Sequence, residues 1–140
     1  MVGPAAFLVY PGAGGSRDHR TLLALEEGLA PLPVFRDEMP RQRAGRAGTD
    51  SAKVAIAAVR DRAEEVAASH GVGTDRIVIG GRSFGGRMCS MAVAEGLEVA
   101  GLVLLSYPLH PPGKPERLRV EHFGSLDVPV LFVSGEKDPF

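Results

Sequence analysis

The residues with the clearest chemical pattern are Gly81-Arg82-Ser83-Phe84-Gly85, a G-x-S-x-G sequence between an apolar run, 76–79, and a helix-like segment, 84–95. A serine at such a strand-turn-helix corner has a strained backbone, and side chains two positions away would collide with the neighbouring strand and helix. The turn raises the Ser83 hydroxyl above the sheet and directs the N–H of Phe84 toward a developing oxyanion. The pattern predicts a nucleophilic serine. A simple glycine-rich turn is the alternative interpretation.

A second glycine-rich turn, Pro11-Gly12-Ala13-Gly14-Gly15, follows the apolar run 5–10. A backbone donor can approach a substrate oxygen only where side chains are small, so this turn is a candidate for the other half of an oxyanion hole, with Ala13 as its donor. Phosphate binding is the competing function, but Arg17 stands where the third glycine of G-x-G-x-x-G belongs, and the P-loop pattern is missing too. A purely structural turn stays open.

The candidate acid is Asp138, in the turn after the last apolar run, 128–134. A triad carboxylate must be held rigidly to orient a histidine and stabilise its imidazolium, and Pro139 helps to fix the turn. The alternative is that Asp-Pro only begins a turn. The expected chain order is serine, acid, histidine, and only Pro139 and Phe140 follow Asp138.

The four histidines all precede the candidate acid. His110 is the nearest substitute base, since its loop follows a predicted strand, although the order of the triad would then be broken. His19 lies near the start of a helix and is a weaker candidate. We interpret His70 and His122 as surface residues, with His70 at a helix C-terminus.

Other reactive residue types have structural explanations. The arginines near the serine and in the loop that follows the second predicted strand could hold an anionic group, but a solvated surface is the simpler account: Arg82, Arg87, Arg41, Arg43 and Arg46. Cys89 lies among apolar residues of the helix after Ser83, and we interpret it as a core residue.

Strands and helices alternate along the chain. Short apolar runs predict strands at 5–10, 33–35, 76–79, 99–105 and 128–134, and periodic segments predict helices from a cap at Ser16 or Asp18 to 29, from a cap at 49–51 to 71, and over 84–95. Residues 36–48 show no periodicity and are predicted as a polar loop. The order predicts an α/β fold: a three-layer α/β/α sandwich with a mostly parallel sheet, whose site lies at the carboxyl ends of the strands.

Length and composition restrict the class of protein further. The 140 residues suit a single domain, 1–140, and a hydrophobic content of 44% supplies a core. A net charge of −1 gives no overall electrostatic attraction for nucleic acid or anionic lipid. The single cysteine cannot form an internal disulfide. No apolar run reaches the roughly 18 residues that span a bilayer. We expect a cytoplasmic protein with a small-molecule substrate and with no cofactor, metal, nucleic-acid or membrane partner.

The chain resembles the α/β-hydrolase superfamily, over nearly its whole length. The segments that carry the resemblance are Gly-Gly-Arg-Ser-Phe-Gly-Gly-Arg-Met (80–88), Leu-Leu-Ser-Tyr-Pro-Leu-His-Pro-Pro-Gly (104–113) and Gly-Glu-Lys-Asp-Pro-Phe (135–140). It is most similar to dienelactone-hydrolase-like bacterial members and to the α/β-hydrolase-like domain of an animal chromatin-complex (NSL) subunit. The resemblance implies the fold predicted above.

By position, the resemblance implies Ser83 as nucleophile, Asp138 as acid, and the N–H groups of Ala13 and Phe84 as the oxyanion hole. Relatives usually have His-Gly where this chain has Pro11-Gly12. Relatives also continue past the Asp-Pro-Phe turn to a loop with the catalytic histidine, so we expect the chain to be the N-terminal part of such a domain. The fold would then be incomplete at its C-terminal edge, with an uncovered apolar strand at 130–133.

The predicted function is a serine hydrolase of ester, lactone or thioester bonds that acts through an acyl-enzyme on Ser83. Without the triad histidine, the 140-residue chain alone is expected to show little turnover. The segment 107–127 is too short for a large lid, which favours an open site for small or protruding esters. The alternative function is a non-catalytic interaction module that keeps the fold, because fold alone does not determine activity.

Overall fold

The computed structural model describes residues 3–107, 122, 124 and 126–134. The strands form one parallel sheet in the order β2-β1-β3-β4-β5. Their bounds are β1 Ala6–Tyr10, β2 Val34–Arg36, β3 Ile77–Arg82, β4 Gly101–Leu105 and β5 Val130–Val133. The helices are α1 Arg20–Leu29, α2 Pro40–Arg43, α3 Ala52–Ser69 and α4 Phe84–Ala94, with a 3-10 turn η1 at Thr74–Arg76. None of the helices in these ranges has the length and apolar character that a bilayer crossing requires.

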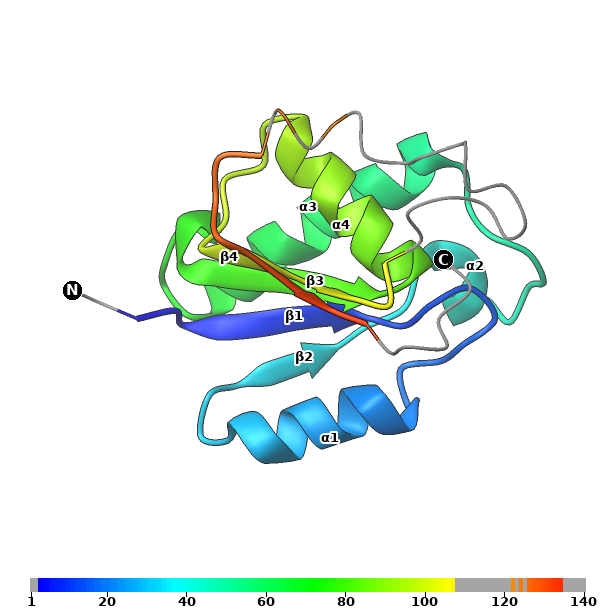
Figure 1. Ribbon diagram of the computed structural model, residues 1–140, viewed down its shortest axis with the longest axis horizontal. Helices are drawn as coiled ribbons and strands as arrows, with labels where there is room; N and C mark the ends of the chain where they lie inside the picture. The colour runs from blue at the N-terminus through cyan, green and yellow to red at the C-terminus, as the bar shows by residue number, and fades with distance from the viewer. Residues whose placement is uncertain (1–2, 108–121, 123, 125, 135–140) are drawn as a thin grey trace.

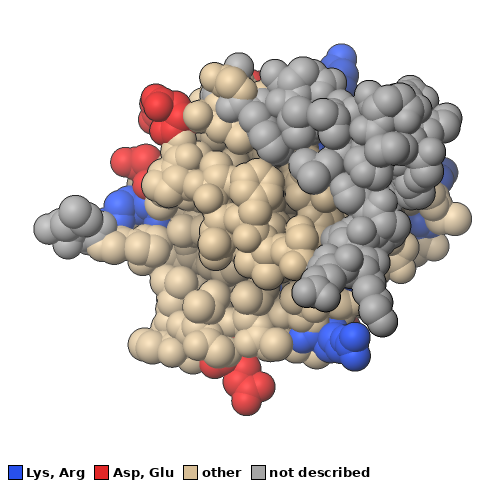
Figure 2. All heavy atoms as spheres, in the orientation of Figure 1, with Lys and Arg blue, Asp and Glu red and all other residues tan. Residues whose placement is uncertain are grey.

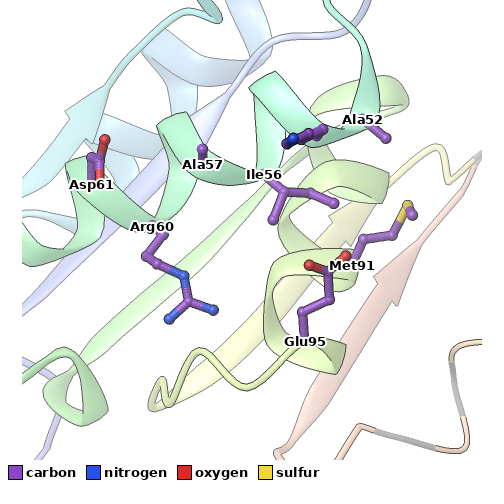
Figure 3. A pocket seen from close by; sticks show the side chains of 8 residues that line it. Ala52, Ile56, Ala57, Arg60, Asp61, Met91 and Glu95 are labelled. Atoms are coloured by element: carbon purple, nitrogen blue, oxygen red, sulfur yellow. The ribbon is translucent and has the colours of Figure 1, made fainter.

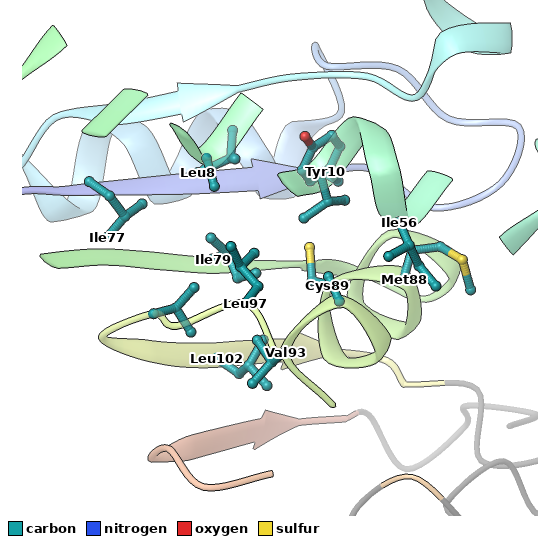
Figure 4. Close-up of a cluster of buried hydrophobic side chains, with 14 of the residues drawn as sticks. Leu8, Tyr10, Ile56, Ile77, Ile79, Met88, Cys89, Val93, Leu97 and Leu102 are labelled. Atoms are coloured by element: carbon teal, nitrogen blue, oxygen red, sulfur yellow. The ribbon is translucent and has the colours of Figure 1, made fainter. Parts of the chain in front are cut away.

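Helices cover both faces of the sheet, which confirms the predicted three-layer fold. Figure 1 shows α1 on one face and α3 with α4 on the other. Because side chains alternate along a strand, Phe7 and Val9 of β1 pack with Leu22 of α1, and Leu8 and Tyr10 belong to the larger cluster under α3 and α4. That larger cluster contains Met88 and Cys89 of α4 (Figure 4). The start of α4 is thus fixed against the end of β1.

β5 is the edge strand of the described sheet, and its side chains are largely exposed. Leu131, Phe132 and Val133 are 58%, 47% and 49% exposed. On the face of the molecule shown in Figure 2, charged side chains stand apart near the margin. The expectation of an exposed apolar strand at 130–133 is confirmed for the described residues.

Two local predictions for the N-terminal half are wrong. The segment 36–48 is not only a loop, because α2 forms inside it: Pro40 is at the first turn, and the Gln42 side chain accepts a hydrogen bond from the Met39 N–H at 3.1 Å. The cap of α1 is His19 and not Ser16 or Asp18, since His19 Nδ1 accepts from the Thr21 N–H at 3.1 Å.

Asp37, just after β2, is the centre of an ion-pair group beside α2. Its carboxylate is 2.8 Å from Arg43 Nη2 and 2.9 Å from Arg62 Nε, and the residue is 8% exposed. The Arg43 contact has hydrogen-bond geometry, whereas Oδ2 has no hydrogen-bond partner and meets Arg62 as an ion pair only. The group joins the end of β2 to α2 and α3.

We expect Asp37→Asn to destabilise the fold by about 1–2 kcal/mol, because it removes the negative charge between two partly exposed arginines. The midpoint of urea unfolding measures this effect. Asp61→Asn is the control, since Asp61 of α3 is exposed and forms no ion pair with a cation of the described residues. Equal midpoints for the two variants would contradict the assigned role of Asp37.

Candidate active site

Ser83 lies at the corner between β3 and α4 with φ 50° and ψ −117°, and its amide is held by a 2.7 Å hydrogen bond to the Leu105 carbonyl. A positive φ is costly for a residue with a side chain. Serine at the N-cap of a helix normally accepts a hydrogen bond from the first turn, but the Ser83 side chain makes none. Ser83 therefore occupies a strained position without serving as a helix cap.

The glycines around Ser83 are required by close backbone contacts. A Cβ atom at position 81 would lie 2.8 Å from the Tyr10 carbonyl oxygen and 2.8 Å from the backbone of Gly85. A Cβ atom at position 85 would collide with the Pro11 carbonyl oxygen and lie 2.8 Å from Tyr10 Cβ. We call this turn between β3 and α4, residues 81–85, the elbow. Its close approach to the end of β1 explains the G-x-S-x-G spacing, as the sequence argument predicts.

The loop after β1 lies directly against Ser83. A Cβ atom at position 12 would be 3.3 Å from Ser83 Cβ and 3.4 Å from the Arg82 carbonyl oxygen. The N–H groups of Ala13 and Phe84 donate to no acceptor in the described residues. The structure therefore brings the loop of Ala13 to the corner of Ser83 and Phe84, and neither amide is used by the described part of the fold.

The described histidines are engaged elsewhere. His19 caps α1, and desolvation, followed by the positive charges of Arg82 and Arg20, lowers its pKa. His70 lies at the C-terminus of α3 as predicted, but it is half-buried and not a surface residue: Nδ1 is 3.0 Å from the Val66 carbonyl oxygen, and the ring packs edge-on against Phe35. His122 was expected at the surface, but it is half-buried, with Nε2 2.8 Å from Ser90 Oγ. His110 and Asp138 lie outside the described residues.

Among the described residues, the other reactive residue types form no further candidate site. Cys89 is fully buried, and burial raises the pKa of its thiol, which agrees with the predicted core role. Arg82 and Arg87 are half-buried, and neither pairs with a carboxylate of the described chain. Within the same residues, no group of three His, Cys, Asp or Glu side chains could hold a metal ion.

A groove of about 470 Å³ lies between α3 and α4, away from the elbow. Figure 3 shows Ile56 of α3 facing Met91 and Glu95 of α4 across it. Ser83 is at the opposite end of α4 from Glu95, and neither Ser83 nor Gly12 lines the groove. This groove is therefore separate from the corner at Ser83.

The family is established by comparison with known sequences. The model of an alpha/beta hydrolase domain matches residues 4–140. The chain belongs to this alpha/beta hydrolase family, which confirms the resemblance drawn from its motifs.

Solved structures show the same fold. TT1662 from Thermus thermophilus is 22% identical with a TM-score of 0.58, and the match covers 93% of this chain and 66% of that one. AbyA5 is 13% identical with a TM-score of 0.64, over 99% of this chain and 50% of that one. A bacterial heroin esterase is 18% identical with a TM-score of 0.52, over 99% and 50%. The chain spans about half to two thirds of the length of these structures.

Proposed function

We propose that the protein is a serine hydrolase that cleaves an ester, lactone or thioester bond through an acyl-enzyme on Ser83. The observation that carries the proposal is the strained backbone of Ser83, whose side chain makes no capping hydrogen bond at the start of α4. Strain of this kind costs on the order of 1–3 kcal/mol and persists where function requires it. Family membership and the heroin esterase fold support the same class of reaction.

The reaction would begin when Ser83 Oγ loses its proton to a general base and attacks the carbonyl carbon of the substrate. The negative charge that develops on the carbonyl oxygen would be bound by the N–H groups of Ala13 and Phe84. Collapse of this intermediate breaks the bond to the leaving group, which takes up the proton and departs. Water then attacks the acyl-enzyme in the same manner and releases the acid and free Ser83.

The other members of the triad are part of the proposal. Asp138 would be the acid that orients the base, and the base would be a histidine. His19, His70 and His122 form their described hydrogen bonds with groups other than Ser83, so none is assigned this role. The substrate would be a small molecule, reached through an open site without a large lid.

Hydrolysis of p-nitrophenyl acetate by the full natural polypeptide tests the proposal. Ser83→Ala is expected to lower kcat by at least about 10³-fold, because the covalent route is lost. Ser69→Ala, a serine at the end of α3 that donates to the Val66 carbonyl, is the matched control with unchanged rates. Equal activity of both variants would overturn the proposal, and a folded protein without any activity would favour a non-catalytic module.

A further inference from the structure

The loop that carries Ala13 is held from outside by the side chain of Gln42 in α2. Gln42 Nε2 donates to the Gly12 carbonyl oxygen at 2.8 Å and to the Gly15 carbonyl oxygen at 3.3 Å. Gln42 Oε1 accepts from the Met39 N–H at 3.1 Å. Both ends of the Gln42 amide are therefore used, and its orientation is fixed.

The contact with Gly12 determines the direction of the next peptide N–H. The Gly12–Ala13 peptide is trans, because the only cis bond in the described chain is Ala30–Pro31. In a trans peptide the C=O of one residue and the N–H of the next point in opposite directions. When Gln42 binds the Gly12 oxygen, the Ala13 N–H must point away from α2. Gly12 itself is packed against Ser83.

We propose that Gln42 is a positioning residue that sets the oxyanion hole by fixing the Gly12–Ala13 peptide. The inference rests on the proposed function, and it adds a residue outside the serine, the acid and the two amide donors. An oxyanion hole is effective only when its donors are already oriented before the reaction. Gly14, with φ 73°, gives this loop access to other conformations, so an external restraint is needed.

The structure anchors Gln42 firmly enough for this task. Met39, which binds the Gln42 oxygen, is 1% exposed and belongs to the main core cluster. Arg43, the next residue of α2, is paired with the buried Asp37. The Gly15 N–H also donates to the Gly12 oxygen, at 3.1 Å. This short turn closes on itself, and within the described chain Gln42 is the side chain that hydrogen-bonds to its carbonyl groups.

Gln42→Glu separates the positioning role from the support of α2. The glutamate keeps an oxygen for the Met39 N–H but replaces the donor to Gly12 and Gly15 with a second oxygen, which repels both carbonyls. Arg46→Gln is the matched control: it changes the net charge by the same −1, and Arg46 lies three residues after the end of α2, with an exposed side chain. Gln42→Met is a second variant, which removes donor and acceptor without adding charge.

The first measurement is covalent reaction of Ser83 in the full natural polypeptide with a fluorophosphonate, resolved into maximal rate and half-saturating concentration. We expect Gln42→Glu and Gln42→Met to lower the maximal rate by about 10- to 100-fold, less than the roughly 10²–10³-fold for loss of a direct donor. The half-saturating concentration should stay within about twofold. The midpoint of the pH profile of the reaction should stay nearly unchanged, because the Gln42 amide binds no proton. Arg46→Gln should react like the wild type. Wild-type rates in Gln42→Glu would overturn the inference.

The second measurement does not depend on activity. The Gly15 amide, followed by NMR hydrogen exchange, should exchange at least about tenfold faster in Gln42→Glu than in Arg46→Gln, because its acceptor is displaced. Equal exchange in both variants would overturn the inference even if Ser83 proved unreactive. A wild type that does not react at Ser83, combined with the expected faster exchange, would instead contradict the proposed function and leave the restraint by Gln42 established.

Discussion

Gly85→Ala is expected to destabilise the protein by about 3 kcal/mol, although helix propensity alone would predict a gain in stability. Alanine in a helix is normally better than glycine by about 1 kcal/mol. At position 85 of α4, however, the new Cβ would collide with the Pro11 carbonyl oxygen and lie 2.8 Å from Tyr10 Cβ. Backbone must move to relieve these contacts, which is the costly kind of overpacking. Urea unfolding measures the change in the free energy of unfolding.

Gly28→Ala in α1 is the matched control, because a Cβ atom there meets no heavy atom within 4 Å. The control should gain stability by up to about 1 kcal/mol. Since Gly85→Ala pushes the loop after β1 away from Ser83, fluorophosphonate labelling should also slow by at least about tenfold. Stabilisation of both variants would contradict the close packing of the elbow against β1.

Ser83→Gly is expected to abolish labelling and to make the fold more stable by about 1 kcal/mol. Glycine accepts φ 50° without steric cost, which relieves strain on the order of 1–3 kcal/mol, and its greater freedom in the unfolded chain offsets part of the gain. The combined result would show that the serine is present at the expense of stability. Both unfolding by urea and labelling of the folded variant are measured.

Ser51→Gly is the control for this second prediction. Ser51 caps α3 with an ordinary φ of −62°, and its side chain accepts from the Val54 N–H. Glycine at this cap should lower stability by a few tenths of a kcal/mol. If Ser83→Gly were destabilising by more than Ser51→Gly, the strain assigned to the elbow would be wrong.

The fold and the elbow were predictable because their signals are local. Apolar runs such as 5–10 end at glycines, and the helix of 52–69 has a clear apolar stripe, so strands and helices alternate visibly. The extension of β3 to Arg82 was not predicted, since Gly80 and Gly81 are weak strand formers. Their pairing with β1 and β4 overrides that preference.

Helix α2, which carries Gln42, was not predicted because 36–48 has no apolar periodicity. A signal did exist: Pro40 at the first helical position, followed by a glutamine three residues after Met39, is the pattern of a capped helix start. The contact of Gln42 with the Gly12 loop, by contrast, joins residues 30 positions apart. Sequence spacing contains no information on that pairing, and only the fold brings it about.

The partner of His122 is another case that sequence patterns could not supply. Its ring approaches Ser90, which lies two turns into α4 and 32 residues earlier. The residue was interpreted as exposed because its sequence surroundings are polar. Ser90 is 0% exposed, and its hydroxyl contacts both the Arg87 carbonyl oxygen, to which it donates, and the His122 ring, each at 2.8 Å.

The most direct test of the account is to identify the residue that reacts with a fluorophosphonate. The full natural polypeptide would be labelled in its folded state, digested, and sequenced by tandem mass spectrometry. The account predicts one phosphonyl group, on the peptide that contains Ser83, and none after unfolding by urea, because the strained corner and its amide donors are then lost. A label on another residue of the folded protein, or equal labelling of Ser83 in the unfolded chain, would contradict it.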